Sequence, residues 1–579
     1  MLSSLKMMWV FVGLLFLVPQ FSTAQWSADP TVNLSIADGS AIQVLPLCVP
    51  TSDGGCYVGW FDLPETGEYY RVFIQRLSPS GEELLPHNGV LVSDHPSKTY
   101  LYDWEMIVDR EDNAVLVFCD TREGDFRPFI YKIDSGGNLL WGPDGIALAN
   151  NDKVFWGFPS LTEAANGDIV VVWPEGEVDT AIMMQRLSPD GDLLLGDGAL
   201  QIGGQSAKNA YTPKVIPSDE DNVIVVWSPD YNYSAKRRIT AQKFDPAGIP
   251  LWADQVDVMD RDAMVLGTFH SLLPDGEGGG FLAWTKTEDL KFTCQVQHLT
   301  SQGIELFPHN GLNAFPESDY QQIYPTLNHD PATGEIWLFS RSQNGSASAC
   351  GLKGQKLTSE GIHLWGLAGR EFLPVDDTLK FAPRSLLVPG SGAMVFQVTG
   401  YSQPVDEDIL IGALVNDEGD FVWPEDFVVM SSILSDKSDL RVIMGSDGMG
   451  KTFWSDRRNG AGDIYGQNIN LDGTLGGSPS TVFDLPTSSQ VAMSVYPNPS
   501  NPGMTIRFDM GVSQAVSLNI YSVDGRLVRT LVDEVRSDGR HEEYWDGRGT
   551  DGLEVSAGVY FSRLEIGDFA ETKHVALIK

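Results

Sequence analysis

A glycine-centred segment recurs eight times along the chain, and this repeat restricts the possible folds more than any other feature. An apolar residue stands four positions before every one of these glycines and four positions after all but the last. Successive glycines are 56, 54, 57, 55, 58, 58 and 54 residues apart, which indicates a structural period. The glycines are Gly81, Gly137, Gly191, Gly248, Gly303, Gly361, Gly419 and Gly473.

Each period contains four candidate β-strands separated by Gly, Asp and Pro turns. In the third copy these are residues 159–164, 168–174, 181–188 and 198–204. The glycine is expected to close the hairpin between the third and fourth strands, where a positive φ is needed. The large apolar residue four positions later is expected to pack between neighbouring sheets. Because such sheets bury their faces only against one another, the sequence predicts an all-β, eight-bladed β-propeller over residues 25–478.

The last repeat is incomplete. No aromatic residue stands four positions after Gly473, and no outer strand follows it. Residues 31–40, ahead of the first repeat, are similar to the outer strands of other repeats, so we expect the N-terminal strand to complete the last blade. Closure of the ring would leave no open sheet edge. A seven-bladed ring with one additional repeat is the alternative.

The first 24 residues have the pattern of a secretory signal peptide. Lys6 precedes an apolar run at 7–18, and Ser22 and Ala24 are the small residues of a cleavage site, which places the mature start near Gln25. The run is too short to span a membrane, and no later segment is long enough. Export allows disulfides, and Cys48 and Cys56 flank an apparent hairpin turn, so a bridge between them is possible. The three other cysteines are expected to be buried free thiols.

The charge of the chain excludes several functions. With 78 acidic and 39 basic residues the net charge is −39, which repels nucleic acids and anionic membranes. No nucleophile elbow, catalytic triad, zinc motif or Asp-box is present, so no catalytic or metal-binding residue is assigned and no cofactor is expected. The Asp-rich segments 218–222 and 274–280 are interpreted as β-turns, with calcium binding as the alternative.

One face of the predicted propeller is the candidate ligand surface. Loops that join second to third strands emerge on the same face as loops that join one blade to the next. The first set is polar and contains Asp62, Asp120, Arg122, Asp456, Arg457 and Arg458. The second set is aromatic and contains Trp104, Trp156 and Tyr211. Aromatic platforms beside polar groups suit sugars or peptides, although each aromatic residue is also suited to fill a gap between blades.

After a linker at 479–492, the sequence pattern changes over residues 493–579. Short alternating strands joined by Asp-Gly turns predict a small antiparallel β-sandwich. Its recurring positions are Pro497, Asn498, Pro499, Trp545, Asp546, Gly547, Gly552, Gly558, Tyr560 and Lys579.

This pattern resembles the Ig-like domain of flagellar hook-capping proteins, a family that overlaps the C-terminal sorting domains of bacterial type IX secretion substrates. The resemblance implies an Ig-like sandwich that addresses the protein to secretion machinery and the outer membrane, with release or surface attachment. A plain interaction or stalk domain is the alternative. Residues 31–478 resemble uncharacterised β-propeller repeats of bacterial surface proteins, and that resemblance implies no known chemistry.

These features favour a secreted or cell-surface binding or adhesion protein whose propeller binds an extracellular glycan or protein, more readily than an enzyme. The first alternative is a carbohydrate-active hydrolase or lyase with carboxylates in the propeller channel. The second is a structural surface component. Carboxylates that converge in one pocket would favour the enzyme.

Overall fold

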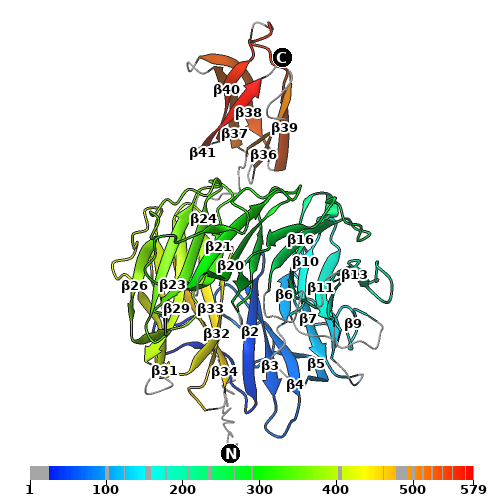
Figure 1. Cartoon of the computed structure of the whole chain (residues 1–579), viewed down its shortest axis with the longest axis vertical. Helices are drawn as coiled ribbons and strands as arrows, with labels where there is room; N and C mark the ends of the chain where they lie inside the picture. The colour runs from blue at the N-terminus through cyan, green and yellow to red at the C-terminus, as the bar shows by residue number, and fades with distance from the viewer. Residues whose placement is uncertain are drawn as a thin grey trace, which may run out of the picture. The chain divides into compact units, whose positions relative to one another are not determined.

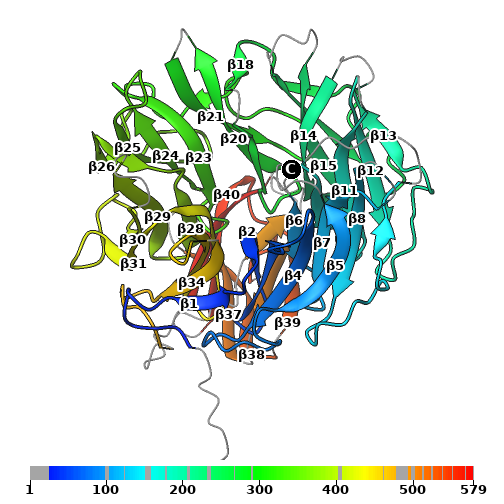
Figure 2. The same ribbon diagram turned by 90° about the horizontal axis from the view of Figure 1, so that it is seen from below.

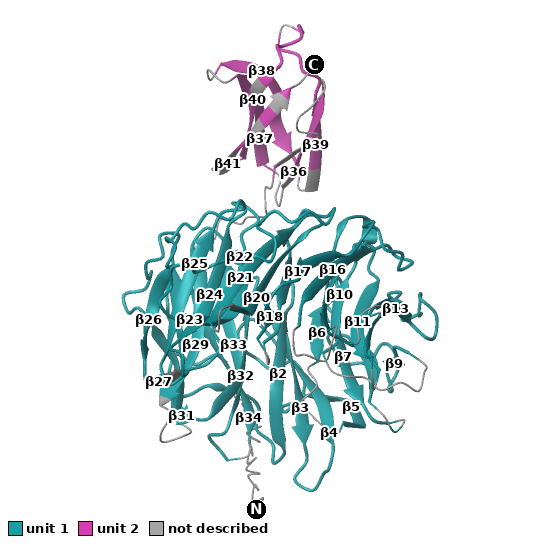
Figure 3. Ribbon diagram, viewed as in Figure 1, with its two compact units in different colours: residues 1–478 teal, residues 479–579 magenta. Residues whose placement is uncertain are grey.

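The structure is a computed structural model of the whole chain. It describes residues 25–97, 104–122, 124, 126–149, 158–176, 179–204, 209–230, 237–265, 268–288, 291–401, 407–460, 462–477, 493–496, 503–510, 514–522, 526–537, 539–550, 552–566 and 569–577. The predicted signal peptide and linker lie outside these residues. The chain divides into two compact units, Met1–Ser478 and Pro479–Lys579, which Figure 3 colours separately.

The described part of the first unit consists of eight antiparallel sheets, and its only helix is the short 3-10 turn Asp219–Asp221. The first four sheets, some of whose strands Figure 1 labels, are β2 (Ile42–Pro50), β3 (Cys56–Leu63), β4 (Tyr70–Leu77) and β5 (Val90–Ser97); β6 (Glu105–Val108), β7 (Ala114–Asp120), β8 (Arg127–Ile133) and β9 (Ile146–Ala147); β10 (Ser160–Glu163), β11 (Ile169–Glu175), β12 (Ala181–Leu187) and β13 (Leu200–Gly203); and β14 (Asn209–Pro217), β15 (Val223–Asp230), β16 (Ile239–Phe244) and β17 (Val256–Met259).

The next three sheets follow the same order, and two of them carry one additional short strand. They are β18 (Ala263–Met264), β19 (Ser271–Pro274), β20 (Gly280–Glu288), β21 (Lys291–Leu299) and β22 (Leu312–Asn313); β23 (Gln321–His329), β24 (Ile336–Gln343), β25 (Cys350–Leu357) and β26 (Arg370–Asp376); and β27 (Thr378–Lys380), β28 (Arg384–Val388), β29 (Gly392–Tyr401), β30 (Asp408–Val415) and β31 (Val428–Ser435). The last sheet joins β32 (Lys437–Met444), β33 (Gly450–Asp456) and β34 (Asp463–Ile469) to β1 (Leu34–Ala37).

The sheets follow one another around a ring in chain order, as Figure 2 shows. The innermost strands contact each other in sequence, from β2 through β6, β10, β14, β19, β23 and β28 to β32, and β32 contacts β2. The fold of this unit is therefore all-β and propeller-like.

The repeated sequence has a repeated structural role. All eight glycines of the repeat have a positive φ, between 77° and 94°. A Cβ on Gly303 would lie 2.7 Å from the indole of Trp252, the residue four positions after the preceding glycine. The Trp252 Nε1 donates a hydrogen bond to Ser301 O in that same turn. The large residue of one repeat thus packs under the glycine turn of the next, as predicted.

A buried glutamine six residues before each of several glycines ties the hairpin together. Gln355 Nε2 donates to Ala314 O at 3.2 Å and to Gly366 O at 2.7 Å. Its Oε1 accepts from the backbone N–H groups of Lys356 and Trp365. The same position is occupied by Gln75, Gln185, Gln242, Gln297 and Gln467. All four hydrogen-bonding directions of the amide are used, which satisfies backbone groups that the sheet leaves unpaired.

The N-terminal segment supplies what the last repeat lacks. β1 pairs antiparallel with β34, so an N-terminal strand is the outer strand of the last sheet. Trp26 lies against the turn of Gly81, and its Nε1 donates to Pro79 O at 2.9 Å. This is the contact that Trp252 makes with the repeat after it, so Trp26 stands in for the aromatic residue missing after Gly473.

The possible bridge between Cys48 and Cys56 is not formed, and all five cysteines are free thiols. In the ladder of β2 and β3, Cys48 lies opposite Val58, and Cys56 lies opposite Pro50. The two cysteines are diagonal neighbours, a relation in which Cα atoms are typically about 7–8 Å apart, beyond the usual range for a disulfide. Burial raises the pKa of Cys56 to about 12, so its thiol stays protonated.

The described part of the second unit is a two-layer β-sandwich. One sheet contains β35 (Ser494–Tyr496), β36 (Met504–Met510) and β39 (Gly539–Trp545); the other contains β37 (Gln514–Ser522), β38 (Leu527–Arg536), β40 (Gly558–Ile566) and β41 (Phe569–Leu577). Met504, Ile506 and Trp545 from the first sheet share one core with Leu518 and Leu564 from the second.

Candidate functional site

Most of the polar residues predicted for the ligand face form ion pairs inside their own sheets. Asp120 is fully buried at the end of β7, and both of its carboxylate oxygens accept hydrogen bonds from Arg122 Nε at 3.0 Å. The Arg122 guanidinium stacks 3.7 Å from the centre of the Phe129 ring and donates to the Tyr131 hydroxyl. Asp62 likewise pairs with Arg71 and accepts from Gln43 Nε2.

The last sheet repeats this arrangement with an additional cation. Asp456 is fully buried and accepts hydrogen bonds from Arg458 at 2.6 Å and from Trp454 Nε1 at 2.8 Å. Lys437 Nζ lies 3.5 Å from the same carboxylate. Burial raises the pKa of Asp456, but the Arg458 hydrogen bond and the Lys437 charge outweigh it and hold the pKa at about 2. Burial lowers the pKa of Lys437 to about 8.

The other predicted residues of this face do not form one site. Trp104 is only 3% exposed; its Nε1 donates to Leu45 O, and its ring packs 4.9 Å from that of Phe61. Arg237 lies over the ring of Tyr211 at 5.5 Å. Arg457 is exposed and pairs with Asp436. Trp156 lies outside the described residues.

A cavity of about 200 Å³ lies among the innermost strands. Residues from the first five sheets and from the last sheet line it. Three of these residues are charged, and most of the others are apolar. The lining residues are Leu47, Trp104, Glu105, Phe158, Pro159, Thr212, Pro213, Lys214, Phe269 and Arg441. Trp104 is the one predicted ligand residue among them.

Glu105 is the only carboxylate in this lining. Its Oε1 accepts from Lys214 Nζ at 2.8 Å, and its Oε2 accepts from the backbone N–H of Leu161 at 2.7 Å. The carboxylate therefore connects β6 to both β10 and β14. Because both oxygens are engaged, Glu105 is suited to hold three sheets in place rather than to transfer protons.

The backbone beside the cavity is strained in a repeated way. Leu45, Thr212, Tyr324 and Asp439 have φ between 47° and 57°, in the left-handed region that non-glycine residues rarely adopt. Each lies where the ladder of its innermost strand shifts register. The first paired residue after the shift is Leu47, Lys214, Thr326 or Arg441. This bulge directs Lys214 and Arg441 from equivalent positions of two sheets, and such strain concentrates at functional sites.

Two aromatic rings and one histidine complete the surroundings. The rings of Phe158 and Phe269 are 4.8 Å apart, and Phe269 is 43% exposed. His270, next in the chain, is buried. Burial and the nearby charge of Lys214 lower the pKa of His270 to about 3, so its imidazole is neutral at physiological pH.

The sequence interpretation missed Glu105, Lys214, Arg441, Phe158 and Phe269. A signal was present, because a proline recurs within the first strand of a repeat, at Pro46, Pro213 and Pro325, or directly before it, at Pro159 and Pro383. Proline inside a strand marks a bulge. An alignment of the repeats on these prolines would have placed Leu47, Lys214 and Thr326 at equivalent positions, each directly after a proline.

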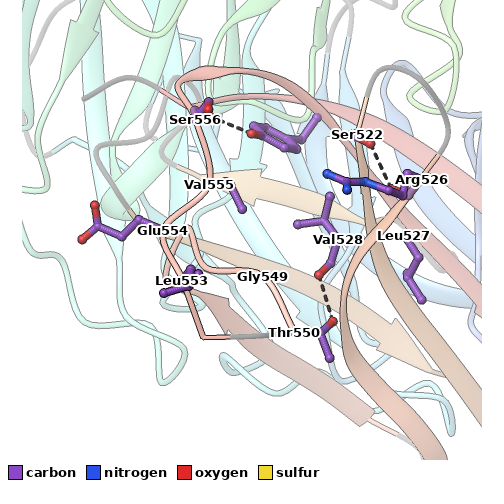
Figure 4. A pocket seen from close by; sticks show the side chains of 11 residues that line it. Ser522, Arg526, Leu527, Val528, Gly549, Thr550, Leu553, Glu554, Val555 and Ser556 are labelled. Carbon is purple, nitrogen blue, oxygen red and sulfur yellow. Dashed lines mark hydrogen bonds between the residues drawn. The ribbon is translucent and has the colours of Figure 1, made fainter.

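The second unit has a larger and more open hollow of about 490 Å³, shown in Figure 4. Arg526, Glu554 and Tyr560 contribute to its lining. Tyr560 belongs to the C-terminal motif, and its hydroxyl donates to Ser556 O at 2.6 Å.

The other described motif residues have structural roles. Trp545 is fully buried, its Nε1 donates to Arg548 O, and its ring meets that of Tyr560 edge-on at 5.3 Å. Asp546 accepts from Arg529 at 2.7 Å. Gly547 and Gly552 have φ of 72° and 74°. Gly558 begins β40. Pro497, Asn498, Pro499 and Lys579 lie outside the described residues.

The described residues contain no group of three or more His, Cys, Asp or Glu side chains placed to hold a metal ion. Among them, too, no helix is both long enough and apolar enough to cross a bilayer.

Comparison with known proteins identifies one family. The model of the FlgD Ig-like domain matches residues 500–565, which confirms the resemblance of the C-terminal domain. No curated protein sequence matches the chain.

Three solved structures illustrate what the chain is similar to. An ulvan lyase of polysaccharide lyase family PL25 is 10% identical, with 78% of this chain and 97% of that one covered and a TM-score of 0.41. The α-L-arabinanase of Penicillium chrysogenum, complexed with arabinobiose, is 12% identical, with 57% and 97% covered and a TM-score of 0.30. PorZ, a surface component of the type IX secretion system of Porphyromonas gingivalis, is 12% identical, with 92% and 81% covered and a TM-score of 0.24.

Proposed function

We propose that this protein is a secreted or cell-surface bacterial glycan-binding protein whose eight sheets are the blades of a closed propeller. The central cavity is its ligand site. The observation that supports this most directly is the composition of that cavity, in which the Phe158 and Phe269 pair stands beside Glu105, Lys214 and Arg441. Aromatic faces cover the apolar faces of sugar rings, and charged groups orient sugar substituents.

A carbohydrate-active enzyme is less well supported. Glycoside hydrolysis ordinarily uses two carboxylates that flank one bond. The described lining of the cavity provides Glu105 alone, and both of its oxygens are hydrogen-bonded within the protein. The buried acids at the ends of β3, β7 and β33 are paired with arginines. We therefore place binding ahead of hydrolysis.

The C-terminal domain is the proposed sorting signal of the protein. Its Ig-like fold supports the resemblance to sorting domains. Its proposed partner is the secretion machinery. Deleting residues 493–579 in a bacterium with a type IX system should leave the protein in the periplasm, whereas surface labelling should detect the full chain. Unchanged surface labelling after the deletion would reduce the domain to an interaction or stalk module.

The binding proposal is tested on a glycan array with the chain from Gln25 to Lys579 and with Phe269→Ala. We expect the full chain to retain one class of glycan and Phe269→Ala to lose most of the signal. Tyr69→Ala is the matched control, because Tyr69 is an exposed aromatic residue outside the cavity lining. Re-imaging the array for loss of substrate separates binding from cleavage. Equal loss in both variants would contradict the cavity as the site.

A further inference from the structure

The cavity has the opposite charge to the protein around it. The whole chain carries a net charge of −39. The charged residues in the cavity lining are Lys214, Arg441 and Glu105, which gives two positive charges and one negative, a net charge of +1. The acidic surface repels anions at long range and does not steer them toward the protein. The cationic cavity therefore favours an anion only at short range, once the anion has reached it.

Of the two cations in the cavity lining, Lys214 pairs with Glu105, whereas Arg441 has no carboxylate within ion-pair distance among the described residues. Arg71, Arg122 and Arg458, by contrast, each pair with an aspartate. Within the described residues, the Arg441 side chain makes one hydrogen bond, a long contact of 3.4 Å from Nη1 to Leu440 O. Arg384 Nε donates to the same carbonyl at 3.0 Å, which fixes the segment that carries Arg441. The guanidinium thus stands on a fixed backbone with its planar donor array available.

The opposite side of the cavity has its charges balanced. Lys214 Nζ lies 2.8 Å from Glu105 Oε1, and the backbone N–H of Leu161 donates a hydrogen bond to Glu105 Oε2. His270 is neutral, so it adds no charge. Among the lining residues the unbalanced charge is therefore a single positive one, and it lies on Arg441; Arg384, whose Nε donates to Leu440 O, lies outside the lining. A singly charged anion would neutralise it, whereas a phosphate monoester carries between one and two negative charges at neutral pH.

The size and the walls restrict the ligand further. A volume of about 200 Å³ exceeds the roughly 150 Å³ that accommodates benzene, so there is room for one six-membered ring with its substituents. The Phe158 and Phe269 pair provides apolar surface for a ring face. A planar guanidinium matches a planar carboxylate in a bidentate pair.

From this geometry, and resting on the proposed glycan-binding function, we propose that the cavity binds a uronate residue of an acidic glycan, with the sugar carboxylate on Arg441 and the ring against Phe158 and Phe269. Arg441 then determines specificity for acidic over neutral sugars.

Isothermal titration with defined tetrasaccharides tests this inference on the chain from Gln25 to Lys579. The probes are oligogalacturonate, oligomannuronate and hyaluronan, each compared with its methyl-esterified form, which keeps the ring but removes the charge. A sulfated galactan and a neutral galactan complete the set. We expect at least one uronate to bind at least about tenfold more tightly than its ester. The affinity for that uronate should fall as the salt concentration is raised.

The variant Arg441→Gln should lose about tenfold or more in affinity for that uronate and keep its weaker affinity for the ester. Arg261→Gln is the matched control, because it removes the same charge from an exposed position outside the cavity. Thermal unfolding reports whether each variant is folded. If Arg441→Gln does not fold, Arg441→Lys, which keeps the charge but loses the bidentate geometry, should give an intermediate loss.

The outcomes separate this inference from the function on which it rests. Equal binding of esters and acids would overturn the uronate assignment while glycan binding stands. Binding of the sulfated galactan alone would overturn it in favour of a sulfate. Binding of none of these probes, or of proteins only, would overturn both proposals.

Discussion

Lys214 on β14 and Glu105 on β6 are joined by a 2.8 Å ion pair that passes over the strand between them, β10. Glu105 also accepts from the Leu161 backbone on β10, so one carboxylate connects three consecutive sheets at their inner edge. The pair lines the cavity and fixes where its charges stand. The same side chains thus hold the centre of the ring and define its electrostatics.

Glu105→Gln should tighten binding of a uronate tetrasaccharide several-fold, because the net charge of the cavity lining rises from +1 to +2. The amide oxygen can still accept one of the two hydrogen bonds, so the loss of stability should be on the order of 1 kcal/mol. Isothermal titration and urea unfolding measure the two effects. A complete loss of binding in a folded Glu105→Gln protein would mean that Glu105 contacts the ligand directly.

Trp26→Ala should destabilise the first unit by about 3–5 kcal/mol, because it empties the buried space under the Gly81 turn and removes the bond to Pro79 O. Denaturant unfolding followed by tryptophan fluorescence and circular dichroism measures this. Val32→Ala, at a residue that is 55% exposed in the same segment, is the control and should change little. If Trp26→Ala behaved like Val32→Ala, the N-terminal segment would not be needed for closure.

Gln355→Leu should cost about 3 kcal/mol, because two carbonyls and two N–H groups lose their partner inside the protein. The seventh repeat offers an internal comparison, since Ala413 stands at the equivalent position. Ala413→Gly, which removes no hydrogen bond, serves as the control for packing loss alone. Thermal unfolding of the two variants should differ clearly, and similar melting temperatures would argue against the glutamine as a structural tie.

Asp456 makes the stability of the last sheet depend on pH. Its pKa is about 2 in the folded protein, below the ordinary value of 3.8 for an aspartate, so the ionised carboxylate stabilises the fold at pH values above 3.8. That contribution, on the order of 2 kcal/mol, is lost as the pH falls from about 4 to 2. In urea unfolding at successive pH values, wild type should lose its advantage over Asp456→Asn across this window. A constant difference down to pH 2 would contradict the low pKa.

The repeat made the architecture predictable, because its period sets strand number, turn position and packing partner together. The third repeat illustrates this: the sequence places strands at 159–164 and 181–188, and the structure has β10 at Ser160–Glu163 and β12 at Ala181–Leu187. The C-terminal fold was predictable for a different reason, since Trp545 and Tyr560 belong to a family pattern.

The cavity was not predictable in the same way. Asp120 and Asp456 are acidic residues in loops of the expected face, and a sequence does not show that Arg122 and Arg458 neutralise them. Glu105 and Lys214 lie 109 residues apart, and only the ring brings their strands together. Trp104 was predicted for an exposed ligand face, but its ring is buried against Gly59 and contributes to the cavity wall.

A crystal structure of the chain with the tightest-binding uronate tetrasaccharide would show directly whether the cavity holds the sugar. We expect one sugar ring in the central cavity, with its carboxylate in hydrogen-bonding contact with the Arg441 guanidinium and its face against Phe158 and Phe269. Sugar bound elsewhere, with the cavity filled only by water, would contradict it.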